Sequence, residues 1–463
     1  MDLQRLRNKK IALLGLGIEN YFLLKFLLNK KIEAQITVCD AKTKHKLQQK
    51  IQEFNNAPLR WRLGESYNKG LTEFDVIFRS PGYPLFDSKI KKAKKDGAII
   101  TSAIRLFFDI CPSQNIIGIT GTKGKGTTSS LIYNIIKTSG RRAFLGGNIG
   151  IAPFSFIDKI KKNDWIVLEL SSFQLEDFTV SPHIAVITNI FPEHLSPADP
   201  NNPNYHHSLA KYWRAKSNIF KYQNENDKLI INHNLINKIK IKPNSKVFTF
   251  SASCPADACF VNKDHLKIKD QLLKIRSSLL GEHNQENIAA AALATKLIGV
   301  GKLHIKKAIK NFRSLPHRLE FIDKIKEVEY YNDSFATTPE STITALKAFS
   351  KPIIWIGGGA DKGANFFNLA NELKKGAKAI ILFKGKGGQK IITELKKINY
   401  PPDKIIIVNN MSSAIKQANK MAVAGDTILL SPACASFGVF KNYKERGELF
   451  RKAIQKIKSK CKN

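Results

Sequence analysis

Residues 118–128 are Gly118-Ile119-Thr120-Gly121-Thr122-Lys123-Gly124-Lys125-Gly126-Thr127-Thr128, and this stretch decides the fold. A short apolar run at 115–119 precedes it, and the apolar spacing of residues 129–136 predicts a helix after it. A glycine-rich turn between a strand and a helix binds phosphate, because its backbone N–H groups and the helix dipole both favour an anion. The stretch therefore predicts a phosphate-binding loop in an α/β domain.

The lysine of this loop and the residues after it predict how a nucleotide is held. Lys125 supplies a positive charge for the outer phosphates, and a hydroxyl usually follows such a lysine and holds magnesium. Here Gly126 follows the lysine, so we expect Thr127 to provide the hydroxyl. Ile119 stands where the first glycine of the common nucleotide loop falls. A glycine-rich turn without any phosphate remains the alternative at this point.

Length and composition predict about three domains with full apolar cores. The chain has 463 residues, of which 43% are hydrophobic. No apolar run approaches the roughly 18 residues of a membrane span, and the apolar residues 11–18 lack a cleavage site after them. We therefore expect a cytoplasmic protein. The six cysteines form no CxxC pair, and only Cys254 and Cys259 lie close together, so neither a disulfide framework nor a zinc site is expected.

The net charge of +37 raises the possibility of a nucleic-acid partner. The lysines are nevertheless spread through every segment rather than gathered in one basic block. Such a distribution is typical of solvated helix faces, and a basic field also attracts nucleotides. We expect no nucleic-acid partner.

The first hundred residues have the pattern of a dinucleotide-binding fold. An apolar strand at 10–18 enters the turn Gly15-Leu16-Gly17, a helical pattern follows at 21–28, and a second strand at 34–39 ends at Asp40. Asn20 replaces the third glycine of that fingerprint, so an ordinary tight turn stays open as the alternative. A strand at 74–78 then ends in Ser80-Pro81-Gly82, at the sheet edge where open α/β folds bind ligands.

Three side chains downstream of the phosphate loop are candidates for chemistry. Glu169 ends a continuous apolar run, where a carboxylate is costly unless it is paired or holds a metal. His194 lies just past a strand at 184–188, and it is a better ligand candidate than His206 in the following polar loop. Lys216 lies in a helical pattern at 205–220 and is one lysine among dozens by sequence alone. Asn284, near the start of an alanine-rich helix, is expected either to contact a nucleotide or to cap the helix.

The last third of the chain predicts another parallel sheet. Strands at 353–356, 379–383, 404–408 and 427–430 alternate with helical patterns, which indicates right-handed crossovers. Residues 330–339 are interpreted as a polar loop before a helix.

Taken in order, these motifs resemble those of the Mur ligases of peptidoglycan synthesis, and the resemblance covers essentially the whole chain. Any one motif is modest evidence, whereas the ordered set is strong evidence. The motifs are Gly15-Leu16-Gly17, Ser80-Pro81-Gly82, the phosphate loop, Gly147-Asn148-Ile149-Gly150, Glu169-Leu170-Ser171-Ser172-Phe173-Gln174, Glu193-His194-Leu195, Ala215-Lys216, Pro316-His317-Arg318, Asn332-Asp333-Ser334, Ser431-Pro432-Ala433-Cys434-Ala435-Ser436, Lys441-Asn442-Tyr443 and Glu445-Arg446-Gly447.

The resemblance is strongest to the family's glutamate-adding branch and implies three α/β domains. These are a Rossmann-like domain for a UDP-linked substrate at 1–104, a central P-loop ATP domain at 105–315, and a Rossmann-like amino-acid domain at 316–463. It further implies that ATP phosphorylates the carboxylate of UDP-N-acetylmuramoyl-L-alanine and that glutamate, expected to be the D-isomer, attacks the acyl phosphate. The expected cofactors are ATP and Mg²⁺, and we expect a monomer.

The resemblance also assigns roles to individual residues. The catalytic set is Lys125, Glu169, His194 and Lys216. The ATP contacts are Gly121, Thr122, Lys123, Gly124, Lys125, Gly126, Thr127, Thr128, Asn284, Arg318 and Asp333. The contacts to the UDP-linked substrate are Gly17, Asp40, Ser80, Gly82, Asn148, Ser171 and Gln174. The amino-acid contacts are Thr337, Lys362, Ser436 and Tyr443. The magnesium ligands are Thr127, Glu169, His194 and a carbamylated Lys216.

Two residues depart from the family pattern, and two other functions remain to be distinguished. Phe335 stands where the family usually has a lysine, and Ser196 replaces a usual aspartate. Folylpolyglutamate synthetases share the glycine-lysine-glycine loop but lack a uridine-nucleotide domain before it, whereas about a hundred residues precede the loop here. A basic P-loop protein that binds nucleic acid is the second alternative, and it predicts a localised basic stripe with salt-sensitive affinity.

Overall fold

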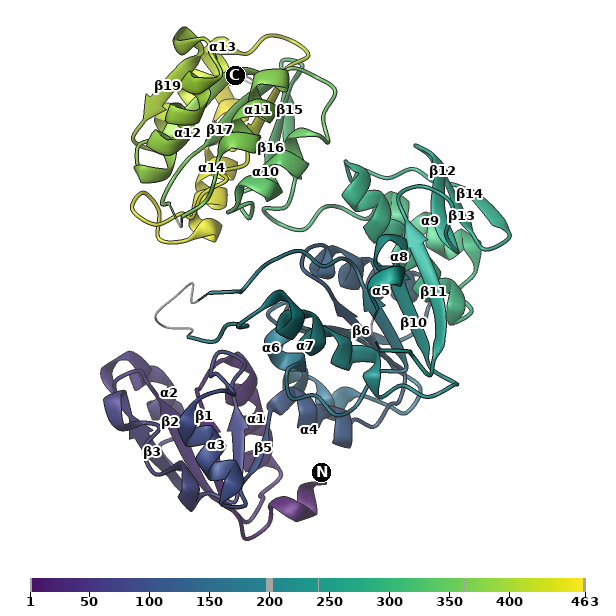
Figure 1. Ribbon diagram of the computed structural model, residues 1–463, viewed down its shortest axis with the longest axis vertical. Helices are drawn as coiled ribbons and strands as arrows, with labels where there is room; N and C mark the ends of the chain where they lie inside the picture. The colour runs from purple at the N-terminus through teal and green to yellow at the C-terminus, as the bar shows by residue number, and fades with distance from the viewer. Residues whose placement is uncertain (1, 197–202, 240, 362, 461–463) are drawn as a thin grey trace. The chain divides into compact units, whose positions relative to one another are not determined.

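The computed structural model describes residues 2–196, 203–239, 241–361 and 363–460. The chain divides into two compact units, Met1–Ile275 with Glu286–Ile309, and Arg276–Gln285 with Lys310–Asn463. The first unit contains two sheets and the second contains one (Figure 1). The three-domain α/β architecture predicted from the sequence is therefore confirmed.

The N-terminal sheet of the first unit is fully parallel, with the strand order β3-β2-β1-β4-β5. Its chain winds outward from β1 in one direction and returns to β4 on the other side, which creates a crevice at the carboxyl ends of these two strands. The strands are β1 (Lys10–Leu14), β2 (Gln35–Asp40), β3 (Leu59–Leu63), β4 (Val76–Arg79) and β5 (Ile99–Thr101). The helices are α1 (Ile18–Asn29), α2 (Gln48–Glu53), α3 (Ser88–Lys95) and α4 (Ala103–Ile110).

The second sheet of this unit has nine strands in the order β14-β13-β12-β11-β10-β9-β6-β8-β7. The phosphate loop follows β6, which lies between β9 and β8. The strands are β6 (Ile116–Thr120), β7 (Ala143–Gly147), β8 (Trp165–Glu169), β9 (Ile184–Ile187), β10 (Lys228–Asn232), β11 (Lys246–Ser251), β12 (Ala258–Asn262), β13 (His265–Ile268) and β14 (Gln271–Lys274). The helices are α5 (Lys125–Thr138), α6 (Ser172–Leu175) and α7 (Leu209–Lys221), with α8 (Glu282–Leu297) and α9 (Lys302–Asn311) crossing the unit boundary.

The far edge of this sheet differs from the sequence expectation. Strands β12, β13 and β14 pair in antiparallel fashion, whereas the sequence analysis predicted no strand after residue 250 in this domain. Cys254 and Cys259 form a disulfide just before and within β12, so the expectation of no disulfide was wrong for this pair. Their spacing of five residues was visible in the sequence, but it matched no framework pattern.

The second unit has a six-stranded sheet in the order β15-β16-β20-β17-β18-β19, parallel except for the β15–β16 hairpin. The hairpin occupies part of the segment that was interpreted as a loop, because β16 extends to Asn332. The strands are β15 (Glu320–Ile325), β16 (Val328–Asn332), β17 (Ile353–Gly357), β18 (Ala377–Phe383), β19 (Ile405–Val408) and β20 (Thr427–Leu430). The helices are α10 (Pro339–Leu346), α11 (Phe367–Gly376), α12 (Lys386–Lys397), α13 (Met411–Met421) and α14 (Tyr443–Lys460).

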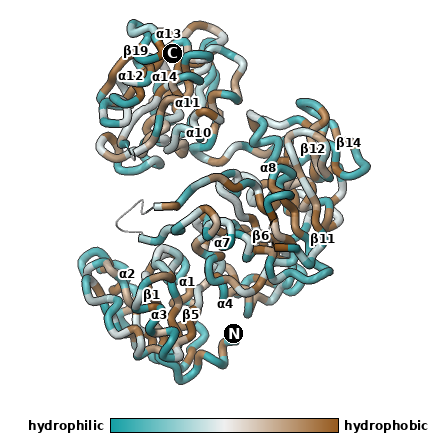
Figure 2. The backbone as a smooth tube through the Cα atoms, in the orientation of Figure 1, coloured by the Kyte–Doolittle hydropathy of each residue, from teal (hydrophilic) through white to brown (hydrophobic). Residues whose placement is uncertain are grey.

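Apolar cores hold each unit together (Figure 2). In the first unit one core joins the two sheets, since Phe154 contacts Phe26 of α1 and Phe107 of α4. In the second unit α10 to α12 cover one face of the sheet and α13 and α14 cover the other. Among the helices of the described residues, none combines the length and the apolarity needed to cross a bilayer.

Candidate active site

The crevice between β1 and β4 is built around a left-handed glycine. Gly15 has φ +86°, and a Cβ there would lie 2.4 Å from Oγ of Ser80. Asp40 fixes the same turn, because its Oδ2 accepts a hydrogen bond of 2.7 Å from the backbone N–H of Leu16. Asn20 donates through its side chain to the carbonyls of Gly15 and Phe78, which explains why asparagine replaces the third glycine of the fingerprint.

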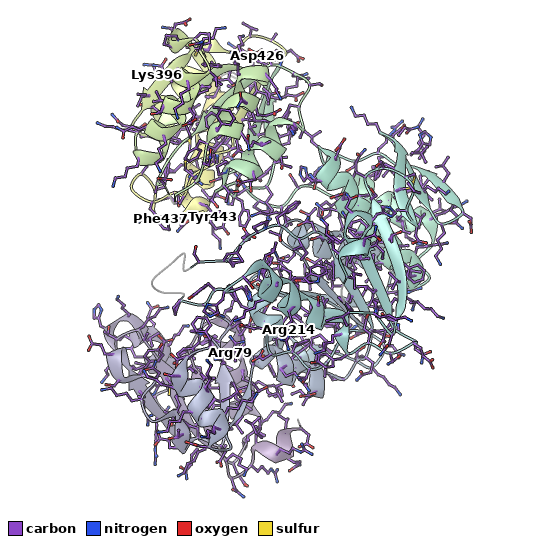
Figure 3. The ribbon with its side chains drawn as sticks, in the orientation of Figure 1. Arg79, Arg214, Lys396, Asp426, Phe437 and Tyr443 are labelled. Carbon is purple, nitrogen blue, oxygen red and sulfur yellow. A yellow bond between two sulfur atoms is a disulfide. The ribbon has the colours of Figure 1, made fainter. Side chains whose placement is uncertain are left out.

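A buried polar contact joins this crevice to the central sheet. Arg79, at the end of β4, donates to the carbonyl of Phe173 at 3.0 Å and pairs with Asp177 at 3.3 Å. Gln174 donates to Glu19, whose pKa burial raises to about 7, although Gln174 and Arg79 both lower it. Figure 3 labels Arg79 where it lies within the first unit.

The phosphate loop has two glycines in the left-handed region that no other residue can replace. Gly121 has φ +142°, and a Cβ would lie 1.9 Å from Oγ1 of Thr188. Gly124 has φ +83°, and a Cβ would lie 2.3 Å from Oδ1 of Asn287. Gly124 is also the N-cap of α5, whose first turn therefore offers backbone N–H groups without intrahelical acceptors. The loop has the geometry of an anion cradle.

Two lysines converge on one carbonyl of this loop. Lys125 donates to the carbonyls of Gly121 and Thr122, both at 3.0 Å. Lys216 donates to the same Gly121 carbonyl at 2.8 Å and to Oγ1 of Thr120 at 3.3 Å. Lys216 is 1% exposed. Burial, and then the positive charge of Lys125, hold its pKa well below the ordinary value for lysine.

Glu169 lies beside the loop at the end of β8, since it pairs in register with Ile119 of β6. Its carboxylate is buried and accepts a hydrogen bond of 2.7 Å from the side chain of Asn148. The backbones of Gly147 and Glu169 also lie close together, because a Cβ on Gly147 would lie 2.2 Å from the carbonyl oxygen of Glu169. The strand end and the glycine-rich loop therefore position one carboxylate near the two lysines, and Glu169 in turn raises the pKa of Lys216.

His194 completes this cluster of the first unit. It has the left-handed φ of +59°, and its ring packs against Phe173 at 5.1 Å. Burial lowers its pKa, the neighbouring Glu193 raises it, and Lys125 and Lys216 lower it further. The field of the two lysines thus reaches His194.

The second unit gathers its motifs at the carboxyl end of its parallel strands. Asp333, just after β16, accepts from Oγ of Ser431 at 2.8 Å and from the backbone N–H of Leu319 at 3.1 Å. Burial raises the pKa of Asp333 to about 7, although these hydrogen bonds and the charges of Arg318 and Arg446 lower it. The loops after β17 and β20 meet through a backbone bridge between residues 360 and 435.

Arg446 ties these loops together from the first turn of α14. Its guanidinium donates to the hydroxyl and the carbonyl of Ser334, at 3.0 and 2.8 Å, and to the carbonyl of Cys434 at 3.2 Å. The Ser334 hydroxyl donates in turn to the carbonyl of Tyr443 at 2.8 Å. Tyr443 and Phe437 lie close together at one end of this unit, and Asp426, just before β20, lies at the other (Figure 3).

Comparisons with known proteins cover most of the chain. The "Mur ligase MurD-like, N-terminal domain" matches residues 9–102, the "Mur ligase middle domain" matches 119–295, and the "Mur ligase, glutamate ligase domain" matches 317–434. A UDP-N-acetylmuramoylalanine–D-glutamate ligase of Clostridium tetani is 38% identical over 461 residues, with 97% of each chain covered. A ligase of the same name from Clostridium kluyveri is 39% identical, also with 97% of each covered.

The chain belongs to the Mur ligase family. It is therefore an ATP-dependent ligase that forms amide bonds. Solved structures share the fold: the UDP-N-acetylmuramate-alanine ligase MurC of Thermotoga maritima has a TM-score of 0.60 at 17% identity, covering 98% of this chain and 100% of MurC. MurF of the same organism, solved in complex with ADP, has a TM-score of 0.61 at 17% identity, covering 99% of this chain and 97% of MurF.

The ligase brings the predicted catalytic residues of the first unit together and gives several other predicted residues a local partner. Lys125, Glu169, His194 and Lys216 lie in one electrostatic cluster. Asn148 is bonded to Glu169, and Asp40 holds the turn that contains Gly17. The remaining placements are these: Ser171 and Gln174 form a capping box on α6; Gly82 lies in the turn closed by Tyr83 and Ser80; Thr128 donates to Asn287; Thr122 contacts Tyr212; Lys123 pairs with Glu193; Thr127 is buried in the first turn of α5.

The predicted contacts of the second unit are placed less uniformly. Asp333, Ser436 and Tyr443 lie at the carboxyl ends of the strands, with Thr337 just before α10. Asn284 lies in the first turn of α8, where its side chain donates to the carbonyl of Leu280 at 2.8 Å. Lys362 lies outside the described residues.

The oxygen donors of the first unit suit a hard cation such as Mg²⁺. Glu169 offers a carboxylate and Thr127 a hydroxyl, the ligand types that magnesium prefers. Among the described residues, no group of three or more His, Cys, Asp or Glu side chains is arranged to hold a metal ion.

Three residues near the site were missed by the sequence analysis. His206 is buried, stacks on Phe173 at 4.9 Å and bonds Ser172 at 3.0 Å, and burial lowers its pKa to about 4. Its position in an Asn- and Pro-rich loop gave no signal of this burial. Arg446 lies inside the motif Glu445-Arg446-Gly447, so its motif membership was the available signal, whereas Asn287 lies one turn after Asn284 in the alanine-rich helix.

Proposed function

We propose that this ligase adds glutamate, the D-isomer, to the carboxylate of UDP-N-acetylmuramoyl-L-alanine at the expense of ATP. Two relatives whose alignments cover 97% of the chain are named as UDP-N-acetylmuramoylalanine–D-glutamate ligases, and these names support the proposed substrates. The observation that carries the chemistry is the convergence of Lys125 and Lys216 on the Gly121 carbonyl beside the buried Glu169. A phosphate cradle that carries a cation, next to a carboxylate that can hold magnesium, is what phosphorylation of a carboxylate requires, because both reactants are anions.

In this proposal the phosphate loop and its lysine bind the nucleotide. Lys125 would exchange one of its two carbonyl acceptors for an oxygen of the outer phosphates. The N–H groups of the first turn of α5 would bind the same phosphates. Together they would neutralise the charge that develops as the γ-phosphoryl group moves to the acceptor carboxylate.

Glu169, Thr127, His194 and Lys216 would hold magnesium, which would screen the phosphate and carboxylate charges when bound. The lowered pKa of Lys216 makes its ammonium easier to deprotonate than that of an ordinary lysine, and the amine is the form that adds to CO₂. Addition forms an N–C bond and releases one proton, which turns the buried amine into a carbamate with two oxygen ligands. Asn148 would hold Glu169 in place through its 2.7 Å hydrogen bond.

The acceptor and the amino acid are assigned to the remaining predicted contacts. Gly17, Asp40, Ser80 and Gly82 would contact the uridine diphosphate at the carboxyl ends of the strands of the N-terminal sheet. Ser171 and Gln174 would face the muramoyl-alanine part. The other proposed contacts, from the second unit, are Asn284, Arg318 and Asp333 for ATP and Thr337, Lys362, Ser436 and Tyr443 for glutamate. We further propose domain boundaries near residues 104 and 315, a monomer, and a reaction in the cytoplasm, where these nucleotides occur.

A substrate-matrix assay of phosphate release tests the proposal. We expect release only when ATP, Mg²⁺, UDP-N-acetylmuramoyl-L-alanine and D-glutamate are all present, with L-glutamate much less effective. Turnover with a folate acceptor would instead identify a folylpolyglutamate synthetase. Salt-sensitive binding of RNA or DNA without any turnover would favour the nucleic-acid alternative.

Replacement of the loop lysine separates nucleotide chemistry from acceptor binding. Lys125→Ala is expected to abolish acyl-phosphate formation while the uridine nucleotide still binds, because Lys125 lies at the phosphate loop and not at the β1–β4 crevice. Lys137→Ala, in the last turn of the same helix, is the matched control and should be fully active. Equal loss of both properties in Lys125→Ala would show that the loop is misassigned.

A further inference from the structure

The second unit carries an aromatic contact at the position where the family motif usually has a lysine. The guanidinium carbon of Arg318 lies 3.7 Å from the centre of the Phe335 ring. The ring of Tyr443 also contacts Phe335 in a T-shaped arrangement, with 5.1 Å between ring centres and an interplanar angle of 90°. Phe335 therefore stands between a proposed nucleotide contact and a proposed glutamate contact.

The backbone around Phe335 is fixed, so the stack is not an accident of a mobile loop. The N–H of Phe335 donates to the carbonyl of His317 at 3.0 Å, which ties the residue to the neighbour of Arg318. The preceding Ser334 is fully buried, accepts from Arg446, and donates to the carbonyl of Tyr443. Tyr443 is thus anchored at its backbone by Ser334, and Phe335 by His317, the residue that precedes Arg318.

The chemistry of the contact differs from that of the usual motif. An aromatic face attracts a guanidinium lying over it, and the planar guanidinium also stacks on the ring, which restricts its rotamers. A lysine ammonium at the same place would repel Arg318. A lysine at this position would add a positive charge. The phenylalanine instead orients the positive charge that Arg318 already supplies.

We propose that Phe335 is a positioning residue that holds the Arg318 guanidinium for the nucleotide and links it to Tyr443, so that nucleotide and glutamate binding are coupled through one aromatic ring. This inference rests on the proposed function, because that function supplies the roles of Arg318 and Tyr443. Glutamate that contacts Tyr443 would order the Phe335 ring. Arg318, stacked on an ordered ring, would then lose less conformational entropy when it binds the phosphates.

The test compares variants of Phe335 by ADP-binding calorimetry and by steady-state phosphate release at low and saturating glutamate. Phe335→Leu and Phe335→Met remove the ring but keep an apolar side chain. We expect them to raise the KM for ATP and the Kd for ADP about five-fold, with kcat within about two-fold, since a cation–π contact of this kind is modest. We also expect the dependence of the KM for ATP on glutamate to disappear. Phe335→Tyr keeps an aromatic ring, so it should retain the wild-type nucleotide affinity and the dependence of the KM for ATP on glutamate.

Two further variants sharpen the result. Phe321→Leu is the matched control, because it removes a half-exposed phenylalanine of the same unit whose ring contacts Tyr331 instead. It should leave ADP binding unchanged. Phe335→Lys restores the residue usual in the family, and we expect a KM for ATP at least as high as that of Phe335→Leu because the ammonium repels Arg318.

Unchanged ADP binding in both Phe335→Leu and Phe335→Met, or tighter binding in Phe335→Lys, would overturn the inference. A wild-type enzyme that shows no glutamate-dependent phosphate release would instead overturn the proposed function. The calorimetric comparison needs neither glutamate nor the acceptor, so these two failures are distinguishable.

Discussion

Two long cationic side chains, Lys216 in the first unit and Arg446 in the second, are almost completely buried, with exposures of 1% and 0%. Both donate to neutral oxygens: Lys216 to the Gly121 carbonyl and the Thr120 hydroxyl, Arg446 to Ser334 and Cys434. Burial lowers the pKa of Arg446 to about 10, whereas the pKa of Lys216 is lowered well below its ordinary value by burial and by Lys125. The guanidinium therefore stays charged at neutral pH, whereas the ammonium of Lys216 loses its proton more easily than that of an ordinary lysine.

The difference separates a cation that keeps its charge from one that holds its proton more weakly. A guanidinium keeps its charge and can satisfy several acceptors in a fixed plane, so it suits the joining of two loops. An amine shifts its pKa readily when it is buried, and its neutral form is a nucleophile. The ligase uses each side chain where its chemistry fits: Arg446 under the loops of the second unit, and Lys216 beside the phosphate loop.

Removal of the structural cation should have the largest effect on stability. Arg446→Met leaves three acceptors without a charged donor, and each such hydrogen bond contributes about 1.5–3 kcal/mol, so we expect a loss of about 5 kcal/mol. Urea unfolding followed by hydrogen exchange in β16 and β20 measures it. Lys452→Met, an exposed position on the same helix, is the control and should cost less than 1 kcal/mol. A small loss for Arg446→Met would remove the structural half of the comparison.

Asp333 should give the second unit a stability that falls as the pH rises. Burial raises the pKa of this carboxyl from 3.8 to about 7, so between these values the folded state keeps a proton that the unfolded chain releases. Its contribution is thus present at low pH and is lost as the pH passes from about 4 to 7, by at most about 4 kcal/mol. Unfolding curves of Asp333→Asn at several pH values should lack this slope, whereas exposed Asp403→Asn should keep it. A slope that persists in Asp333→Asn would place the titration elsewhere.

Much of this site followed from strand ends in the sequence. Glu169 was identified because a carboxylate in a buried apolar run is costly unless it is paired or holds a metal, and His194 because it lies just past a strand. The phosphate loop was predicted with its strand and its helix, and α5 begins at Lys125. Local patterns suffice for such features because they depend on neighbouring residues along the chain.

Features that depend on distant residues were not predictable in this way. The burial of Lys216 depends on its packing against the loop after β6, about 95 residues earlier, and nothing in its own helix indicates it. The buried position of His206 depends on Phe173 and Tyr212. The β15–β16 hairpin was missed because Tyr330 and Tyr331 precede polar Asn332 and Asp333, which favour a loop locally.

Replacement of Lys216 should lower the stability only slightly but abolish nearly all activity. Lys216→Met loses two hydrogen bonds, both to neutral acceptors. We therefore expect the free energy of unfolding to fall by only about 1–2 kcal/mol, partly offset by the packing of methionine. Phosphate release should fall to background, and the carbamate signal that we propose for the wild-type enzyme in ¹³C-bicarbonate should be absent. Lys211→Met, exposed on the same helix, should retain both. A destabilisation as large as that of Arg446→Met would mean that Lys216 is a structural cation too.

The smallest effect is expected for Lys123, a cation of the phosphate loop that is exposed and paired. Lys123 pairs with Glu193 at 2.7 Å, and their side chains are 43% and 28% exposed. Burial raises the pKa of Glu193, but Lys123, His194 and Lys125 together lower it below the ordinary value, so the pair stabilises the fold above about pH 4.5 and is lost as the pH falls through the folded pKa. A double-mutant cycle with Lys123→Ala and Glu193→Gln should give a coupling energy of about 0.5–1 kcal/mol that shrinks in high salt. A salt-independent coupling of several kcal/mol would show that solvent does not reach this pair, and the contrast between the exposed and the two buried cations would then fail.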